Sequence, residues 1–127
     1  MPHLKRVMLH LARSKDHPAG SAVHGYELVA PITPAGHIDT AAWKAQRERC
    51  RVRRFWQGEA DQEGVLVHKP GGSEHARWVF DYDRNREDDD ETGYRFGAHR
   101  FVPGEYLTLR ERGNDHTFKI VSVENAA

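Results

Sequence analysis

Hydrophobic and polar residues alternate with a period of about two along much of the chain, and the pattern starts near the N-terminus. Within residues 4–12, Val7, Leu9 and Leu11 occupy every second position. Successive side chains of a β-strand point to opposite faces of the sheet, so this spacing predicts a strand with one apolar face.

Further short segments show a β-type composition, and turn residues separate them. Glycines in the connections supply the positive φ angles that tight hairpin turns require. Two pairs of segments, 64–69 with 76–82 and 105–112 with 117–123, are the clearest hairpins. In chain order the predicted strands are residues 4–12, 26–32, 51–56, 64–69, 76–82, 94–96, 99–102, 105–112 and 117–123.

One segment has the composition of a helix. Residues 40–49 contain no glycine or proline and are rich in good helix formers. Asp39 precedes them and is suited to accept hydrogen bonds from the first turn as an N-cap. The sequence therefore predicts one short helix at about residues 39–50, whose inner face carries Ala42, Trp43, Gln46 and Cys50.

Closely spaced strands with a single helix favour an antiparallel arrangement, since a parallel sheet would need alternating helices. The fold class predicted is mainly β: a small, partly closed antiparallel β-barrel or sandwich of about seven or eight short strands. We expect residues 1–127 to form a single domain, with an acidic loop at about 84–92 and a frayed tail at 124–127.

The charge balance argues against nucleic acid as the partner. The 127 residues hold 19 Lys and Arg against 19 Asp and Glu, so the net charge is zero with neutral histidines. Binding to phosphates usually demands a basic excess. Arginines at 47, 49, 51, 53 and 54 form the densest basic stretch, but strand alternation is expected to divide them between two faces.

Cysteine content and the N-terminal sequence indicate the compartment. The chain has one cysteine, Cys50, whereas small secreted domains usually carry several. Charged residues interrupt the N-terminus, so a signal peptide is not expected. No apolar run approaches the length of a membrane helix, about 20 residues. These features predict a soluble cytoplasmic protein that does not enter a membrane.

The common catalytic templates do not occur in the chain. It has no G-x-S-x-G elbow, no phosphate-binding G-x-x-x-x-G-K-[ST] and no G-x-G-x-x-G after a strand. Cys50 follows the predicted helix, where the negative end of the helix dipole raises a thiol pKa, so we interpret it as structural. These observations favour a protein that is not an enzyme and needs no cofactor.

Nine histidines nevertheless make a divalent metal site a hypothesis to test. No two histidines are closer than seven residues, so metal ligands would have to come from several strands. Asp81 and Asp83 lie two apart at the end of the predicted strand 76–82, hence on one side of an extended chain, and could contribute carboxylates. The ligand set of such a site would be drawn from His24, His68, Asp81, Asp83, His99 and His116.

The most distinctive segment is residues 93–105, GYRFGAHRFVPGE. Glycine within a strand marks a bulge that can turn side chains toward a pocket, and Pro103-Gly104 suits a type II turn. The alternative is a purely structural role, in which the segment forms a strand–turn–strand corner and its aromatic rings fill the core. As a ligand-binding set we predict Tyr94, Arg95, His99 and Arg100, with His68 across the sheet.

Three function classes follow from these features. The leading hypothesis is a non-catalytic β-barrel module that binds a small anionic ligand, a peptide or a protein partner. The first alternative is a small metal-assisted enzyme, cupin-like or a hydrolase, that uses histidines and aspartates of neighbouring strands. The second is single-stranded nucleic-acid binding, which requires the arginines of residues 49–56 to gather with exposed aromatic side chains.

Overall fold

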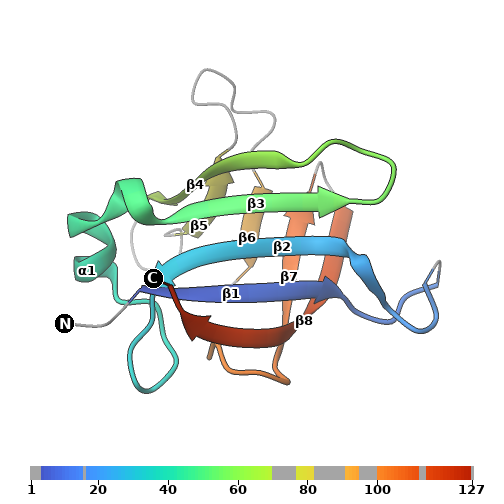
Figure 1. Cartoon of the computed structure of the whole chain (residues 1–127), viewed down its shortest axis with the longest axis horizontal. Helices are drawn as coiled ribbons and strands as arrows, with labels where there is room; N and C mark the ends of the chain where they lie inside the picture. The colour runs from blue at the N-terminus through green and yellow to red at the C-terminus, as the bar shows by residue number, and fades with distance from the viewer. Residues whose placement is uncertain are drawn as a thin grey trace.

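The computed structural model describes residues 4–15, 17–69, 77–81, 91–94, 100–111 and 114–126. Within this part of the chain, eight antiparallel strands follow one another in sequence order, and the last pairs with the first to close a barrel (Figure 1). The elements are β1 (Leu4–Leu11), β2 (Ser21–Pro31), α1 (Thr40–Ala45), the 3-10 turn η1 (Arg47–Arg49), β3 (Arg51–Trp56), β4 (Gln62–Lys69), β5 (Arg77–Asp81), β6 (Glu91–Tyr94), β7 (Tyr106–Glu111) and β8 (Asn114–Asn125).

The mainly β class, the antiparallel barrel and the short helix predicted from the sequence are confirmed. Of the strands, β3 has the predicted bounds, and the pairing of β4 with β5 and of β7 with β8 matches the predicted hairpins. Among the described residues, no helix is both long and apolar enough to cross a membrane.

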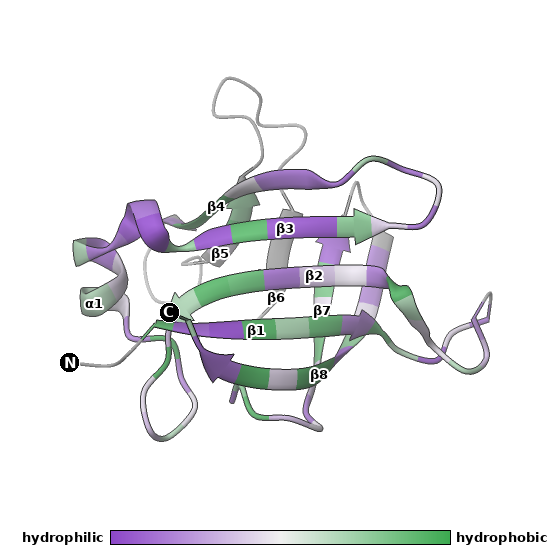
Figure 2. Cartoon of the chain, in the orientation of Figure 1, coloured by the Kyte–Doolittle hydropathy of each residue, from purple (hydrophilic) through white to green (hydrophobic). Residues whose placement is uncertain are grey.

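The barrel interior follows the alternation seen in the sequence. In β1 the buried positions are Val7, Leu9 and Leu11, and hydrophobic and hydrophilic positions succeed one another along β1–β3 (Figure 2). At the centre the fully buried Tyr26 ring contacts Phe80 at 5.3 Å and Phe118 at 5.1 Å between ring centroids. Strands far apart in the sequence thus share one aromatic core.

Strand β2 begins at Ser21, whereas the sequence predicted a strand only from Tyr26 and turns before it. Periodicity does not predict the first part of β2, because residues 21–25 do not alternate between apolar and polar side chains. Its inward residue is His24, and the next position, Gly25, has no side chain. Gly25 pairs with His10 of β1 and with Phe55 of β3, so it lies within the sheet.

The helix is shorter than the predicted residues 40–49. Asp39 caps it as expected, because its Oδ1 accepts a hydrogen bond from the Ala42 N–H at 2.9 Å. Gln46 leaves the helical region at φ −131°, and the chain continues as η1. Helix propensity favours a longer element, but the chain must turn here to enter β3. Of the predicted inner face, Ala42, Trp43 and Cys50 are buried.

The region before β7 corrects another strand prediction. Residues 100–102 do not form a strand, because the Phe101 N–H donates to the Gly36 carbonyl oxygen rather than to a sheet neighbour. The predicted turn at Pro103-Gly104 is confirmed by Gly104 at φ 96° and by a hydrogen bond from the Glu105 N–H to the Val102 carbonyl.

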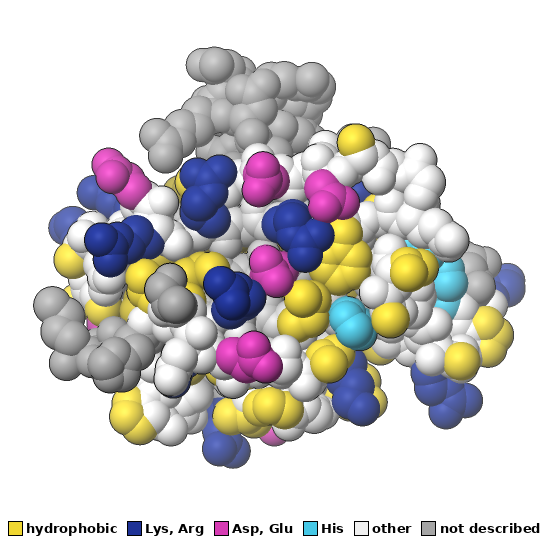
Figure 3. All heavy atoms as spheres, viewed as in Figure 1, with side chains coloured by type: hydrophobic (Ala, Val, Ile, Leu, Met, Phe, Trp, Pro, Cys, Tyr) yellow, Lys and Arg dark blue, Asp and Glu magenta, His cyan; other side chains and the backbone are white. Residues whose placement is uncertain are grey.

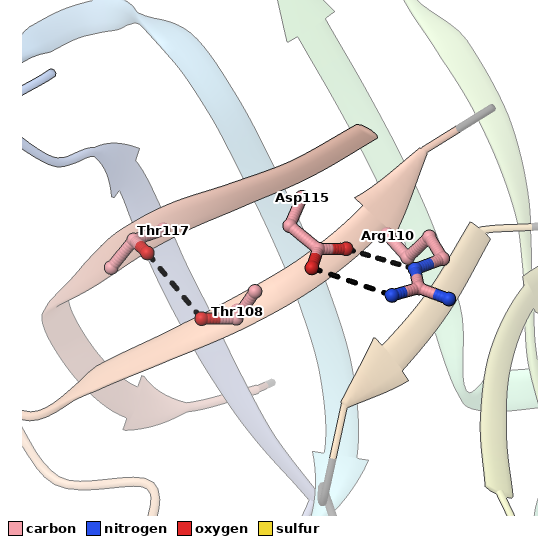
Figure 4. A network of polar contacts seen from close by, with 4 residues as sticks. All are labelled: Thr108, Arg110, Asp115 and Thr117. Carbon is pink, nitrogen blue, oxygen red and sulfur yellow. Dashed lines mark hydrogen bonds and ion pairs between the residues drawn. The ribbon is translucent and has the colours of Figure 1, made fainter. Parts of the chain in front are cut away.

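The C-terminal hairpin is held by side-chain pairs on its outer face. Arg110 donates to both carboxylate oxygens of Asp115, at 2.9 and 3.4 Å, and these hydrogen bonds lower the pKa of Asp115 (Figure 4). The Thr108 and Thr117 hydroxyls lie 3.4 Å apart in the adjacent cross-strand pair. Such cross-strand pairs help to fix the register of the hairpin.

Strand β8 is longer than the predicted residues 117–123. It begins at Asn114, where the sequence placed a turn, and it continues through residues that we expected in a frayed tail. Glu124 and Asn125 instead pair with Arg6 and Lys5 of β1. This pairing closes the barrel, which explains why polar residues at the end of the chain remain in a strand.

Candidate functional site at the barrel mouth

Polar and aromatic side chains gather at the end of the barrel opposite α1, where β2 starts and β3 ends (right in Figure 1). We call this group the barrel mouth, defined by His17, His24, Arg54, Trp56 and His116. Openings of small barrels are common ligand sites, because side chains from several strands converge there.

Strand alternation places these residues together. Arg54 and Trp56 continue the inward side of β3 after the buried Val52. The β2–β3 register sets His24 opposite Trp56. His116 comes from β8, two positions before the buried Phe118, and its ring centroid lies 5.9 Å from that of Trp56. The mouth therefore extends the aromatic core toward solvent.

His24 is the most enclosed imidazole of the mouth, with 7% of its surface exposed. Its ring packs edge to face against Trp56 at 4.5 Å and tilted against His17 at 4.8 Å. Its Nδ1 lies 2.6 Å from the Ser21 hydroxyl oxygen. That hydroxyl also accepts a hydrogen bond from the Val23 N–H at 3.3 Å, so Ser21, the first residue of β2, is tied to both the His24 ring and the local backbone.

Arg54 gives the mouth a permanent positive charge. Only 4% of this residue is exposed, and a guanidinium keeps its positive charge in proteins. Its Cζ lies 4.5 Å from the Trp56 ring centre in a cation–π contact. Its Nη1 donates to Glu59 Oε1 at 3.1 Å. The Glu59 side chain is 57% exposed, so the ion pair reaches from the barrel interior to solvent.

Burial lowers the pKa of His24 from its ordinary value of 6.5. The positive charges of His17 and Arg54 act in the same direction, and the Glu59 carboxylate opposes them. His24 is therefore a neutral imidazole at pH 7, able to donate one hydrogen bond and accept another.

Acid is expected to destabilise the protein through His24. Because the folded-state pKa lies below 6.5, the unfolded chain takes up a proton first, and stability falls as the pH drops from about 6.5 through the folded pKa. Stability from this group is fully present above pH 6.5. Urea unfolding at a series of pH values tests this. The variant His24→Gln should have a shallower decline over this range.

The pKa of His10 is also lowered by burial, so the variant keeps part of the slope. Equal pH dependence in the wild type and in His24→Gln would show that His24 does not control the acid response.

Comparisons with protein-family models, with curated proteins and with solved structures found no match.

The predicted metal ligands come together only in part. His24 and His116 both contact Trp56, but His68 lies near α1, 4.6 Å from the Trp78 ring and 6.0 Å from Trp43. Within the described residues, no three His, Cys, Asp or Glu side chains are grouped to hold a metal ion. Of the other three candidates, the backbone of Asp81 lies in β5, and Asp83 and His99 fall outside the described residues.

The predicted anion-binding corner is described only in part. Arg100 is exposed, and its Nε donates to the Ala35 carbonyl oxygen at 3.4 Å. The backbone of Tyr94 lies in β6 opposite Thr108. Arg95 and His99 lie outside the described residues, so the corner as a ligand site stays a prediction.

Two structural interpretations from the sequence agree with the geometry. Strand alternation divides the arginine stretch, because Arg54 faces inward while Arg53 lies outside and forms ion pairs with Glu27 and Asp61. Cys50 is buried, and burial raises the pKa of its thiol to about 11. A thiol with this pKa is a poor nucleophile near neutral pH.

Sequence reasoning did not place Arg54, Trp56 or His17 in a small-ligand site. Residues 54 and 56 entered only through the nucleic-acid alternative, as part of residues 49–56. The signal for the first two was present, because Arg54 and Trp56 share a face with Val52 and that face is the apolar one of β3. An arginine on a core-facing position is unusual enough to suggest a function. His17 belongs to the connection between β1 and β2, where no periodicity predicts a neighbour.

Proposed function

We propose that this protein is a non-catalytic binding module that takes a small anionic ligand at the barrel mouth. The observation that carries the proposal is Arg54, a charged side chain placed inside a barrel whose other inward positions are mostly apolar. Burying a charge is costly unless partners compensate. Glu59 and Trp56 are such partners, and a binding role explains why a charged residue occupies this inward position.

The groups around Arg54 suit a carboxylate or a phosphate. A guanidinium donates paired, charge-assisted hydrogen bonds to such anions, and these are stronger than bonds between neutral groups. His116 and His17 supply further ring N–H groups, and the half-buried Trp56 supplies an apolar wall. This combination of one fixed charge, imidazole donors and an aromatic surface is typical of small-ligand sites.

Glu59 acts in this proposal as an internal competitor. Its carboxylate occupies Arg54 from the solvent side, in the turn between β3 and β4. A ligand anion takes over this position, and the exposed Glu59 side chain moves into water at little cost. Replacing Glu59 with glutamine should therefore strengthen anion binding.

The proposal places the protein in the cytoplasm and makes it neither a metalloenzyme nor a nucleic-acid binder. Support comes from its single cysteine, its zero net charge and the missing catalytic motifs.

Anion binding can be tested by titration with acetate, succinate, citrate and inorganic phosphate, followed by calorimetry and tryptophan fluorescence. Arg54→Gln is expected to weaken binding of the best anion by about 10- to 100-fold, since hydrogen bonds to a charged group contribute about 1.5–3 kcal/mol. The matched control is Arg53→Gln, which removes the next arginine, on the outer face. The affinity of Arg53→Gln for the same anion should equal that of the wild type.

Thermal unfolding of both variants separates loss of binding from loss of fold. Equal weakening in Arg53→Gln, or no saturable binding of any of the four anions to the folded wild type, would contradict the proposal.

A further inference from the structure

A second feature lies on the outside of the barrel, where the end of β1 and the connection to β2 approach β7 and β8. Here the surface forms a groove of about 730 Å³. Its lining includes Arg13, Ala22, Pro103, Tyr106, Lys119 and Val121. Basic and hydrophobic side chains are visible side by side toward the lower right of Figure 3, over this part of the barrel.

The floor of the groove is unusually apolar for an outer surface. Tyr106 is 52% exposed and Val121 is 43% exposed, and both rank among the exposed large hydrophobic residues of the described chain. Val121 occupies a β-bulge, because Leu9 pairs with Ile120 while Met8 pairs with Ser122. A bulge redirects a side chain out of the regular alternation, here on a strand that otherwise buries its hydrophobic residues.

The charged side chains in the described lining of the groove have one sign. They are Arg13 and Lys119, and no aspartate or glutamate is among the described residues that line it. His10 also belongs to the lining, and burial lowers its pKa, so it is neutral at pH 7. The net positive charge of the groove contrasts with the central surface of Figure 3, where acidic and basic side chains alternate over β2–β4.

We propose that this groove binds an extended acidic segment of a partner protein. Apolar side chains of the segment lie on Tyr106 and Val121, and its carboxylates face Arg13 and Lys119. Positive and negative surfaces that meet in this way select the partner and speed its association. An exposed apolar patch with a polar rim is the usual form of a protein interaction site.

A second copy of the same chain fits this groove less well. A two-fold dimer brings the same patch of each subunit together, so Arg13 and Lys119 would face basic residues again. Single-stranded nucleic acid is disfavoured because Tyr106 and His10 are the only aromatic rings in the described lining, whereas base stacking usually uses several exposed rings.

The mode of binding follows from the closed sheet. β1 pairs with β2 on one side and with β8 on the other, and β8 also pairs with β7. Neither β1 nor β8 therefore has a free edge to which a strand could be added. The segment must therefore be recognised through its side chains. The groove adjoins the barrel mouth at Ser21, whose hydroxyl contacts His24. Tyr106 and Lys119 are exposed and belong only to the groove, whereas Arg54 faces the interior, so the two sites can be disrupted separately.

The proposal can be tested by fluorescence anisotropy with a labelled peptide of about ten residues in which glutamate alternates with leucine. Lys119→Glu and Tyr106→Ser are each expected to weaken binding about tenfold or more, because one replaces attraction with repulsion and the other removes apolar contact area. The matched control is Lys44→Glu, the same charge change on the exposed face of α1. It should bind like the wild type.

The proposal would be overturned if Lys44→Glu weakened peptide binding as much as Lys119→Glu, or if a peptide with lysine in place of glutamate bound with equal affinity. Tighter binding of oligo(dT) than of the peptide would also overturn it. So would a wild-type dimer that Tyr106→Ser converts to a monomer. Lys119→Glu should bind anions at the barrel mouth with the affinity of the wild type. Failure of the groove proposal can therefore be told apart from failure of the proposed function.

Discussion

Replacing Gly25 with alanine is expected to lower the free energy of unfolding by about 3 kcal/mol or more. A Cβ at this position would lie 2.0 Å from the Leu9 carbonyl oxygen and 3.0 Å from Cζ of Phe55. The Leu9 oxygen belongs to the backbone of β1, so a side-chain rotation cannot relieve the clash. β1 and β2 must separate, and their pairing is part of the barrel closure.

Urea unfolding followed by circular dichroism measures this effect. The matched control is Gly58→Asn in the β3–β4 turn, where φ is 87° and, apart from the adjacent residues, no atom of the described residues lies within 4 Å of the added Cβ. Asparagine tolerates a left-handed backbone, so the control should change stability by only about 0.5 kcal/mol. A Gly25→Ala protein as stable as the control would show that the β1–β2 approach is looser than described.

Trp43→Ala is the second substitution with a large expected effect, a loss of about 3–5 kcal/mol. Trp43 is 5% exposed, its ring packs edge to face on Trp78 at 5.2 Å, and its Nε1–H donates to the Leu66 carbonyl oxygen at 2.9 Å. These contacts hold α1 against the barrel. A helix of six residues is too short to persist without them.

Trp43→Phe separates packing from hydrogen bonding. It keeps an aromatic ring but leaves the Leu66 carbonyl without the indole donor, so we expect a smaller loss of about 1–2 kcal/mol. Amide hydrogen exchange should show residues 40–45 exchanging faster in Trp43→Ala while β1 and β8 stay protected. Uniform loss of protection throughout the barrel would contradict a local role for Trp43.

Much of the fold could be predicted because a strand that is buried on one face has alternating hydrophobic and polar residues in its sequence. Val7, Leu9 and Leu11 show it directly, and β1 lies where they indicate. Local side-chain chemistry was equally informative at Asp39, which caps α1. These features depend on residues close together in the sequence, so short windows suffice.

What escaped prediction depends on partners distant in the sequence. Ser21–Gly25 joins β2 because β1 and β3 pair with it, and Glu124 and Asn125 remain in β8 because β1 lies alongside. Neither segment has enough apolar residues for its sequence to predict a strand. Pairing across long sequence separations overrides local composition at such positions.

The candidate site was harder to find for the same reason. The sequence drew attention to His24 and His116, but nothing in their spacing reveals that the ring of Trp56, on β3, contacts both of them. Arg54 was grouped with neighbouring arginines as surface charge, although alternation with Val52 already assigns it to the barrel interior. Its inward position should have outweighed its membership of a basic run.

The most direct test of the account is a backbone and side-chain NMR titration of the folded wild type with the best of the four anions. Binding at the barrel mouth predicts saturable shifts of the Arg54 Nε, the Trp56 indole and the His24 and His116 rings, with Arg53 unaffected. Shifts centred on other residues, or shifts that persist unchanged in Arg54→Gln, would contradict it.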